Sequence, residues 1–278
     1  MTDELSTTES LAGLPPEVSA FREHFVAGRA DFAEASIRDH AKDIASRLTV
    51  FDNPFIAGVV DDFFPPDLYD RLVSNWPATK DIPSVDLSAV ARNYSVSERR
   101  GLRLDQADDT RSASFSGGPW PAVRAFFESP TLVSGLVTRF AGEIQDQIAT
   151  LDGRSGDPEY KLWLNYDAGS LEALGAHVDH PRKLLTIVVY IGLDGAIDKS
   201  SPQRWGTSLY DVGNESIEAL EFSPNAQRSA ARTVEFERNR AFIMPNSRRA
   251  LHGVAGGQPG VGRATLMCGY WLASLPQQ

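Results

Sequence analysis

The C-terminal half of the chain is a series of short β-type segments, and this series constrains the fold more than any other feature. After Gly156, apolar runs follow one another, separated by glycine, asparagine, proline or acidic clusters. The predicted strands are YKLWLNY, KLLTIVVYIGL, TSLYDV, ARTVEF, RAFIMP, RALHGV and RATLMCGYWLA. Short strands with turn residues between them are typical of a β-sandwich or barrel. We therefore expect a sandwich over residues 156–278.

The first half of the chain has a helical pattern instead, with apolar residues recurring at three- and four-residue steps. This periodicity predicts helix from Glu17 to about Leu48, from Pro66 onward, and from Pro119 to Leu151 with a break at Ser129-Pro130. A strand, FIAGVV, lies between the first two. Residues 80–118 are polar, and we expect a long irregular segment there that covers a pocket.

These patterns predict one compact unit of mainly β class with N-terminal helices (α+β). The expected divisions are a disordered segment at 1–16, a helical part with one or two strands and the irregular segment at 17–155, and a β core at 156–278.

The composition indicates the cellular compartment and limits the classes of binding partner. A net charge of −10 and a pI near 5.0 argue against general binding to nucleic acid or anionic membranes, because phosphate binding needs a basic surface. The single cysteine, Cys268, excludes an intramolecular disulfide framework and a cysteine-based zinc site. No apolar run is long enough to span a bilayer, and the acidic N-terminus lacks a signal-peptide pattern, so we expect a cytoplasmic protein.

Three residues suggest a metal site. His177 and Asp179 are two positions apart, so in an extended segment both side chains point to one face, while His180 points away. A second strand-borne histidine, His252, follows in RRALHGV. Two histidines and one carboxylate form the facial triad of non-haem Fe(II) oxygenases, which leaves coordination positions open. With 5 histidines and 37 acidic residues in 278, a His-x-acid pair alone is weak, since about 0.7 such pairs occur by chance.

The wider pattern resembles the 2-oxoglutarate- and Fe(II)-dependent dioxygenases, particularly their prolyl-4-hydroxylase-like branch. That family has H-x-D, then a distal histidine, then an arginine or lysine about ten residues on; here the residues are His177-Val178-Asp179, His252 and Arg263. Further similarities are Tyr166 and Gly169 before the first ligand, and Thr186 and Tyr190 on the next strand. The family's G-G-x-L strand is matched less well, because Thr207 replaces the second glycine.

The resemblance implies a double-stranded β-helix core (jelly-roll, cupin-like) that binds Fe(II), 2-oxoglutarate and O2, with ascorbate as an accessory reductant. It implies that His177, Asp179 and His252 are the metal ligands and catalytic centre. Arg263 would anchor the far carboxylate of 2-oxoglutarate. The co-substrate contacts implied beside it are Tyr190, Tyr166, Thr186 and Thr265.

The same resemblance implies hydroxylation of an unactivated C–H bond with release of succinate and CO2. A small residue replaces the carboxylate in the family's halogenases, so Asp179 favours hydroxylation, desaturation or cyclisation over halogenation. With no second recognition domain evident, we expect a small-molecule substrate such as a free amino acid or a biosynthetic intermediate. A peptidyl prolyl-type hydroxylase, a non-catalytic cupin-like binding module and an interaction protein using the acidic N-terminal helix remain alternatives. The oligomeric state is left open.

Overall fold

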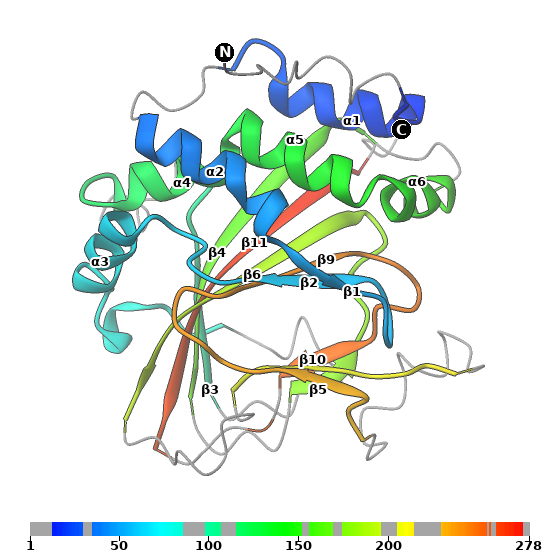
Figure 1. The fold of residues 1–278 in the computed structure, drawn as a ribbon. Helices are drawn as coiled ribbons and strands as arrows, with labels where there is room; N and C mark the ends of the chain where they lie inside the picture. The colour runs from blue at the N-terminus through cyan, green and yellow to red at the C-terminus, as the bar shows by residue number, and fades with distance from the viewer. Residues whose placement is uncertain are drawn as a thin grey trace.

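The computed structural model forms two antiparallel β-sheets with a layer of helices over one face of the larger sheet (Figure 1). The residues that it describes are 13–29, 35–85, 98–106, 115–151, 156–168, 174–195, 205–213, 229–254, 256 and 260–274.

The helices belong to the N-terminal half of the chain. They are α1 (Pro16–Val26), α2 (Ala35–Arg47), α3 (Pro66–Ser74), α4 (Trp120–Glu128), α5 (Pro130–Arg139), α6 (Ala141–Ala149) and a short 3-10 turn, η2 (Thr79–Asp81). Each α-helix buries an apolar stripe in one core shared with the large sheet. In the described part of the chain, no helix combines the length and apolar character needed to cross a membrane.

The helix predictions are partly confirmed. α3 starts at Pro66, and the break between α4 and α5 falls at Ser129, whose hydroxyl caps α5 by accepting from the Leu132 amide. The prediction of one helix from Glu17 to Leu48 is wrong. α1 ends at Val26, and Gly28 then adopts a φ of +70°, a left-handed conformation that terminates helices.

The large sheet has seven strands in the order β1-β2-β9-β6-β11-β4-β3, and the small sheet has four in the order β5-β10-β7-β8. The strands are β1 (Thr49–Phe51), β2 (Ala57–Val60), β3 (Glu98–Arg103), β4 (Pro158–Ala168), β5 (Leu174–His177), β6 (Lys183–Asp194), β7 (Thr207–Leu209), β8 (Arg232–Val234), β9 (Ala241–Pro245), β10 (His252–Val254) and β11 (Gly262–Leu272).

The last eight strands, β4 to β11, pass repeatedly between the two sheets, with β7 and β8 paired as neighbours in the small one. β4, β6, β9 and β11 lie in the large sheet, and β5, β7, β8 and β10 lie in the small one. Two four-stranded antiparallel layers built by such crossing form a jelly-roll, or double-stranded β-helix, so the predicted fold class is confirmed. All seven predicted strands of this half are present, and the short β5 is an addition.

β3 replaces part of the segment expected to be irregular. It pairs with β4 at the edge of the large sheet, and residues 83–85 cover its other side through a bridge between Ser84 and Arg100. The remainder of the expected cover, residues 86–97 and 107–114, lies outside the described residues.

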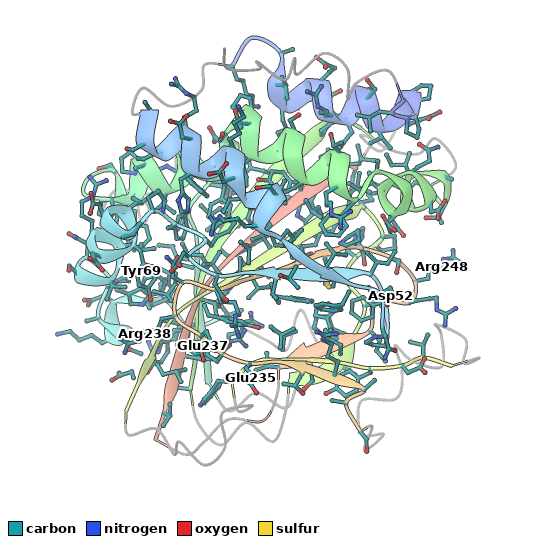
Figure 2. All side chains as sticks on the ribbon, viewed as in Figure 1. Asp52, Tyr69, Glu235, Glu237, Arg238 and Arg248 are labelled. Atoms are coloured by element: carbon teal, nitrogen blue, oxygen red, sulfur yellow. The ribbon has the colours of Figure 1, made fainter. Side chains whose placement is uncertain are left out.

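Strand alternation divides the large sheet into two faces. On β6, Ile187 and Val189 pack with the helices, as do Leu266 and Cys268 on β11, while the alternate side chains face the small sheet. Tyr69 of α3, labelled in Figure 2, donates to the Ile191 carbonyl at 2.5 Å and ties the helical layer to β6. The apolar layer thus fixes the strands whose other face forms the site.

Candidate metal centre and cavity

The two predicted histidine ligands face each other across neighbouring strands of the small sheet. His177 ends β5, His252 begins β10, and the two are direct register partners, with ring centroids 4.4 Å apart. His252 Nδ1 lies 2.9 Å from the Ala250 carbonyl. Because a carbonyl only accepts hydrogen bonds, Nδ1 carries the hydrogen and Nε2 is left with a lone pair for a ligand. Burial lowers the pKa of His252, which favours the neutral, metal-binding form.

Asp179 completes the cluster from the turn after β5. One ligand atom each from His177, Asp179 and His252 lie within 4.8 Å of one another. Burial alone would raise the pKa of the Asp179 carboxyl, but Lys183, the two histidines and a hydrogen bond from Thr186 together hold it below its usual range. Asp179 is therefore an ionised carboxylate beside two imidazoles, a donor set that suits a divalent transition metal.

Lys183 is a partner of the cluster that the sequence did not predict. Its ammonium donates to Asp179 Oδ2 at 3.0 Å, and the Thr186 hydroxyl donates to the same oxygen at 2.7 Å. With Oδ2 engaged twice, Oδ1 is the oxygen left for a metal. Lys183 is only 2% exposed, and it fits because Gly269 lies opposite: a Cβ there would come within 2.7 Å of Lys183 Cε.

A cavity of about 680 Å³ lies between the two sheets and contains the cluster. At one end, Arg263 of β11 is 3% exposed, and its Nε has no hydrogen-bond partner among the described residues. Burial lowers the pKa of its guanidinium, which nonetheless remains charged at neutral pH. A buried cation with an unused N–H in a cavity wall has the chemistry to bind an anionic ligand.

Three of the other predicted co-substrate contacts lie in or beside the cavity. Thr265 lines the cavity beside Arg263, and Tyr190 lies next to them, with the Arg263 guanidinium 5.3 Å from its ring centroid and its hydroxyl 2.6 Å from Thr207 Oγ1. Thr186 also lines the cavity, but its hydroxyl is bonded to Asp179.

Tyr166, the remaining predicted co-substrate contact, lies on the face of β4 that is turned away from the cavity. It belongs to the helix-facing core, and its hydroxyl packs against Gly262. The inward positions of β4 are Trp163, Asn165 and Asp167. The family-like spacing pointed to the tyrosine, whereas alternation from Trp163 would have pointed to its two neighbours.

His180 is exposed, as expected, although it reaches the cavity rim. Arg99 and Arg103 of β3 also line the cavity, and neither was predicted as a site residue. Their inward position follows from β3 pairing with β4, a long-range contact that local sequence does not reveal.

Comparison with known proteins gives structural similarities only. No family model and no curated protein sequence matches the chain. Solved structures that are similar include a prolyl-4-hydroxylase from Pseudomonas putida, with 12% identity, a TM-score of 0.44, and coverage of 85% of this chain and 98% of that one. A Trichoplax adhaerens prolyl hydroxylase in complex with a hypoxia inducible factor peptide has 12% identity, a TM-score of 0.47, and coverage of 85% and 90%.

A third similar structure is an oxidoreductase of the 2OG-Fe(II) oxygenase family from Burkholderia pseudomallei, with 11% identity, a TM-score of 0.44, and coverage of 88% and 96%. All three TM-scores are below 0.5, so these similarities do not bear on what the chain does. The function has to be inferred from the side chains that the fold brings together around the cavity.

Proposed function

We propose that the protein is an Fe(II)- and 2-oxoglutarate-dependent dioxygenase that hydroxylates an unactivated C–H bond of a small molecule and releases succinate and CO2. The observation that carries this proposal is the convergence of His177, Asp179 and His252 within 4.8 Å, in a cavity that also holds the buried guanidinium of Arg263. Bound Fe(II) and 2-oxoglutarate would supply the power to oxidise a C–H bond with O2.

The residues of the chain fit this chemistry. His177, Asp179 and His252 offer two neutral nitrogens and one carboxylate oxygen, and three ligands leave the rest of an octahedral sphere open. Lys183 and Thr186 both bind Asp179 Oδ2, so they hold the carboxylate in one orientation.

Arg263 would bind the distal carboxylate of 2-oxoglutarate. A guanidinium can offer two parallel N–H groups to a carboxylate, and burial strengthens such a pair because little water competes. The neighbouring Thr265 side chain lines the same wall and adds a hydroxyl. Enclosure of the cavity between the two sheets would also limit access of bulk water to the reacting centre.

Turnover of labelled 2-oxoglutarate by the purified protein, with Fe(II), ascorbate and a panel of metabolites, tests the proposal. We expect succinate release that rises with the correct substrate. Asp179→Ala should lose bound metal, whereas Arg263→Leu should keep the metal and lose 2-oxoglutarate binding. Tyr166→Phe, on the opposite face of β4, is the matched control and should keep both. Unchanged metal content in Asp179→Ala, together with no succinate from any candidate, would rule the proposal out.

The Arg263 variant also separates an enzyme from a cupin-like binding module. A module that binds its ligand without redox chemistry has no need of 2-oxoglutarate. In that case Arg263→Leu would leave ligand binding intact.

A further inference from the structure

The half of the cavity next to β3 has polar groups for which the proposed function has no use. Along β4, Asp167, Asn165 and Trp163 pair in register with Arg99, Gly101 and Arg103 of β3, and all six line the cavity. Arg263 lies on β11, on the other side of β4. Two strand spacings, roughly 10 Å, therefore separate the backbone of Arg263 from that of β3. A 2-oxoglutarate molecule bound between the metal cluster and Arg263 would leave the β3 side of the cavity free, with Asp167 and Asn165, the β4 register partners of Arg263 and Thr265, lying between the two regions.

Arg103 is held in place before any ligand arrives. Its Nε donates to Asp105 Oδ1 at 2.9 Å, its Nη2 donates to Asp105 Oδ2, and its guanidinium lies 5.2 Å from the Trp163 ring centroid. Asp105 in turn accepts from the Leu162 amide of β4 at 2.9 Å. This arrangement uses Nε and one hydrogen of Nη2, so the Nη1 amino group and the second Nη2 hydrogen are available to a ligand.

Asn165 presents an unsatisfied donor next to this guanidinium. The residue is 5% exposed, and its Nδ2 has no hydrogen-bond partner among the described residues. Gly101 opens the space in front of it, because a Cβ at that position would lie 3.2 Å from Asn165 Oδ1 and 3.1 Å from Val85 Cγ2. Buried donors are nearly always hydrogen-bonded in native proteins, so an unused one in a cavity wall indicates a ligand acceptor.

Asp167 adds an acceptor at the next inward position. It is 1% exposed and forms an ion pair with Arg99, with 3.4 Å between Oδ1 and Nε, but the same Oδ1 makes no hydrogen bond within the described part of the chain. Donors at Asn165 and Arg103 therefore stand beside an acceptor at Asp167. A ligand that complements them carries both an acceptor group and a donor group.

The charge balance of the cavity favours a negative acceptor. Arg99, Arg103, Lys183 and Arg263 are opposed by Asp167, Asp179 and the Asp105 that binds Arg103, which leaves one positive charge. A divalent metal and doubly charged 2-oxoglutarate cancel each other. The excess positive charge is then available to the substrate, in a protein whose overall charge is −10.

We propose that Asn165, Arg103 and Asp167 form a substrate subsite for a free carboxylic acid that carries an ammonium or hydroxyl group on the adjacent carbon. Asn165 Nδ2 and Arg103 Nη1 bind the carboxylate, and Asp167 Oδ1 accepts from the adjacent donor. This inference rests on the proposed function and narrows it to free 2-amino or 2-hydroxy acids. A peptide-bound residue, in which the carboxylate is an amide, would leave the net positive charge of the cavity unmatched.

The test compares matched pairs of probes on the Fe(II)-loaded enzyme with labelled 2-oxoglutarate. The probes are the standard amino acids and their 2-hydroxy analogues, each with its carboxamide and its N-acetylated dipeptide. We expect at least one free acid to stimulate succinate release, and its amide and peptide to do so with kcat/KM lower by roughly 10- to 100-fold, as for loss of a charge-assisted hydrogen bond.

Two variants assign the effect to the subsite. Arg103→Gln with Asp105→Asn removes the ion pair as a unit without leaving an unpaired charge, and Asn165→Ala removes the donor alone. Each should lose preference for the acid while the affinity for 2-oxoglutarate in the absence of substrate is unchanged. Lys161→Gln with Glu159→Gln removes a comparable pair, 2.7 Å apart on β4 and outside the cavity lining, and should keep the preference.

The outcomes separate the two proposals. If the wild-type protein neither binds 2-oxoglutarate nor forms succinate, the proposed function fails. If 2-oxoglutarate binds but no free acid is preferred to its amide, the subsite is overturned and a peptide or neutral substrate is favoured. The subsite is also overturned if Asn165→Ala lowers the affinity for 2-oxoglutarate in the absence of substrate.

Discussion

Lys183→Met should destabilise the metal-free protein far more than the metal-bound protein. In the metal-free state Lys183 is the nearest cation to Asp179, with 3.0 Å between Nζ and Oδ2, and the two side chains are 3% and 14% exposed. At an effective dielectric constant of about 20, attraction across that distance is ~5 kcal/mol. Desolvation of both groups offsets part of it. Removing one partner of a buried pair typically costs about 3–5 kcal/mol, because the other charge is left uncompensated.

A bound divalent ion would compensate Asp179 in place of the lysine. The loss of stability in Lys183→Met should therefore be clearly smaller when metal is saturating, which means that the variant binds metal more tightly than the wild type. Urea denaturation with a chelator and with excess Mn(II) measures both quantities, and calorimetric titration with Mn(II) gives the affinity directly.

Lys161→Met is the matched control, since its ion pair with Glu159 is partly exposed and should contribute less than about 1 kcal/mol. An equal loss for Lys183→Met with and without metal would refute the reasoning. Such a result would mean that the lysine contributes packing and not counter-charge.

Three further predictions concern the large sheet. Gly269→Ala should lower the free energy of unfolding by about 1–3 kcal/mol, because the new Cβ would lie 2.5 Å from Trp271 Nε1 and 2.7 Å from Lys183 Cε; thermal denaturation tests this, and an unchanged Tm would contradict it. The Cys268 thiol is fully buried and burial raises its pKa, so a thiol reagent at pH 8 should modify it only after denaturation, as mass spectrometry can show. Tyr190→Phe should weaken 2-oxoglutarate binding more than Tyr166→Phe does, because Tyr190 adjoins Arg263 and Tyr166 lies in the helix-facing core. Calorimetric titration measures both affinities, and the reverse order would contradict binding of 2-oxoglutarate on the cavity face of the large sheet.

Sequence patterns predicted the strands whose own residues favour β structure. After Gly156, each apolar run either alternates apolar with polar residues or is apolar throughout, and each corresponds to an observed strand. The strand β3 escaped prediction because its sequence, ERRGLR, is charged and has little β propensity. It is a strand because β4 on one side and residues 83–85 on the other supply its hydrogen bonds.

The candidate site shows the same division between local and long-range information. The spacing of His177 and Asp179, and a second strand histidine, were sufficient to predict the cluster that the fold brings together. The burial of Lys183 was not predictable, since a lysine after a turn is normally solvated, and here the space for it is provided by Gly269 and Trp271 of a distant strand. The family-like spacing before His177 pointed to Tyr166, whereas the two-residue period of β4 puts this side chain on the helix-facing side and Asn165 and Asp167 on the cavity side.

The two sheets differ in size, and this difference has a consequence for how the site can change. Arg263 stands on an eleven-residue strand paired on both sides and backed by helices, whereas the histidines stand on strands of four and three residues. The amide protons of the long strands should exchange slowly with solvent, and those of the short strands should exchange quickly. A metal ion bound by His177 and His252 would link β5 to β10 and slow the exchange there. Mutations next to the short strands should therefore change the lining of the cavity without destabilising the large sheet. An architecture of this kind can acquire new substrate specificities at little cost in stability.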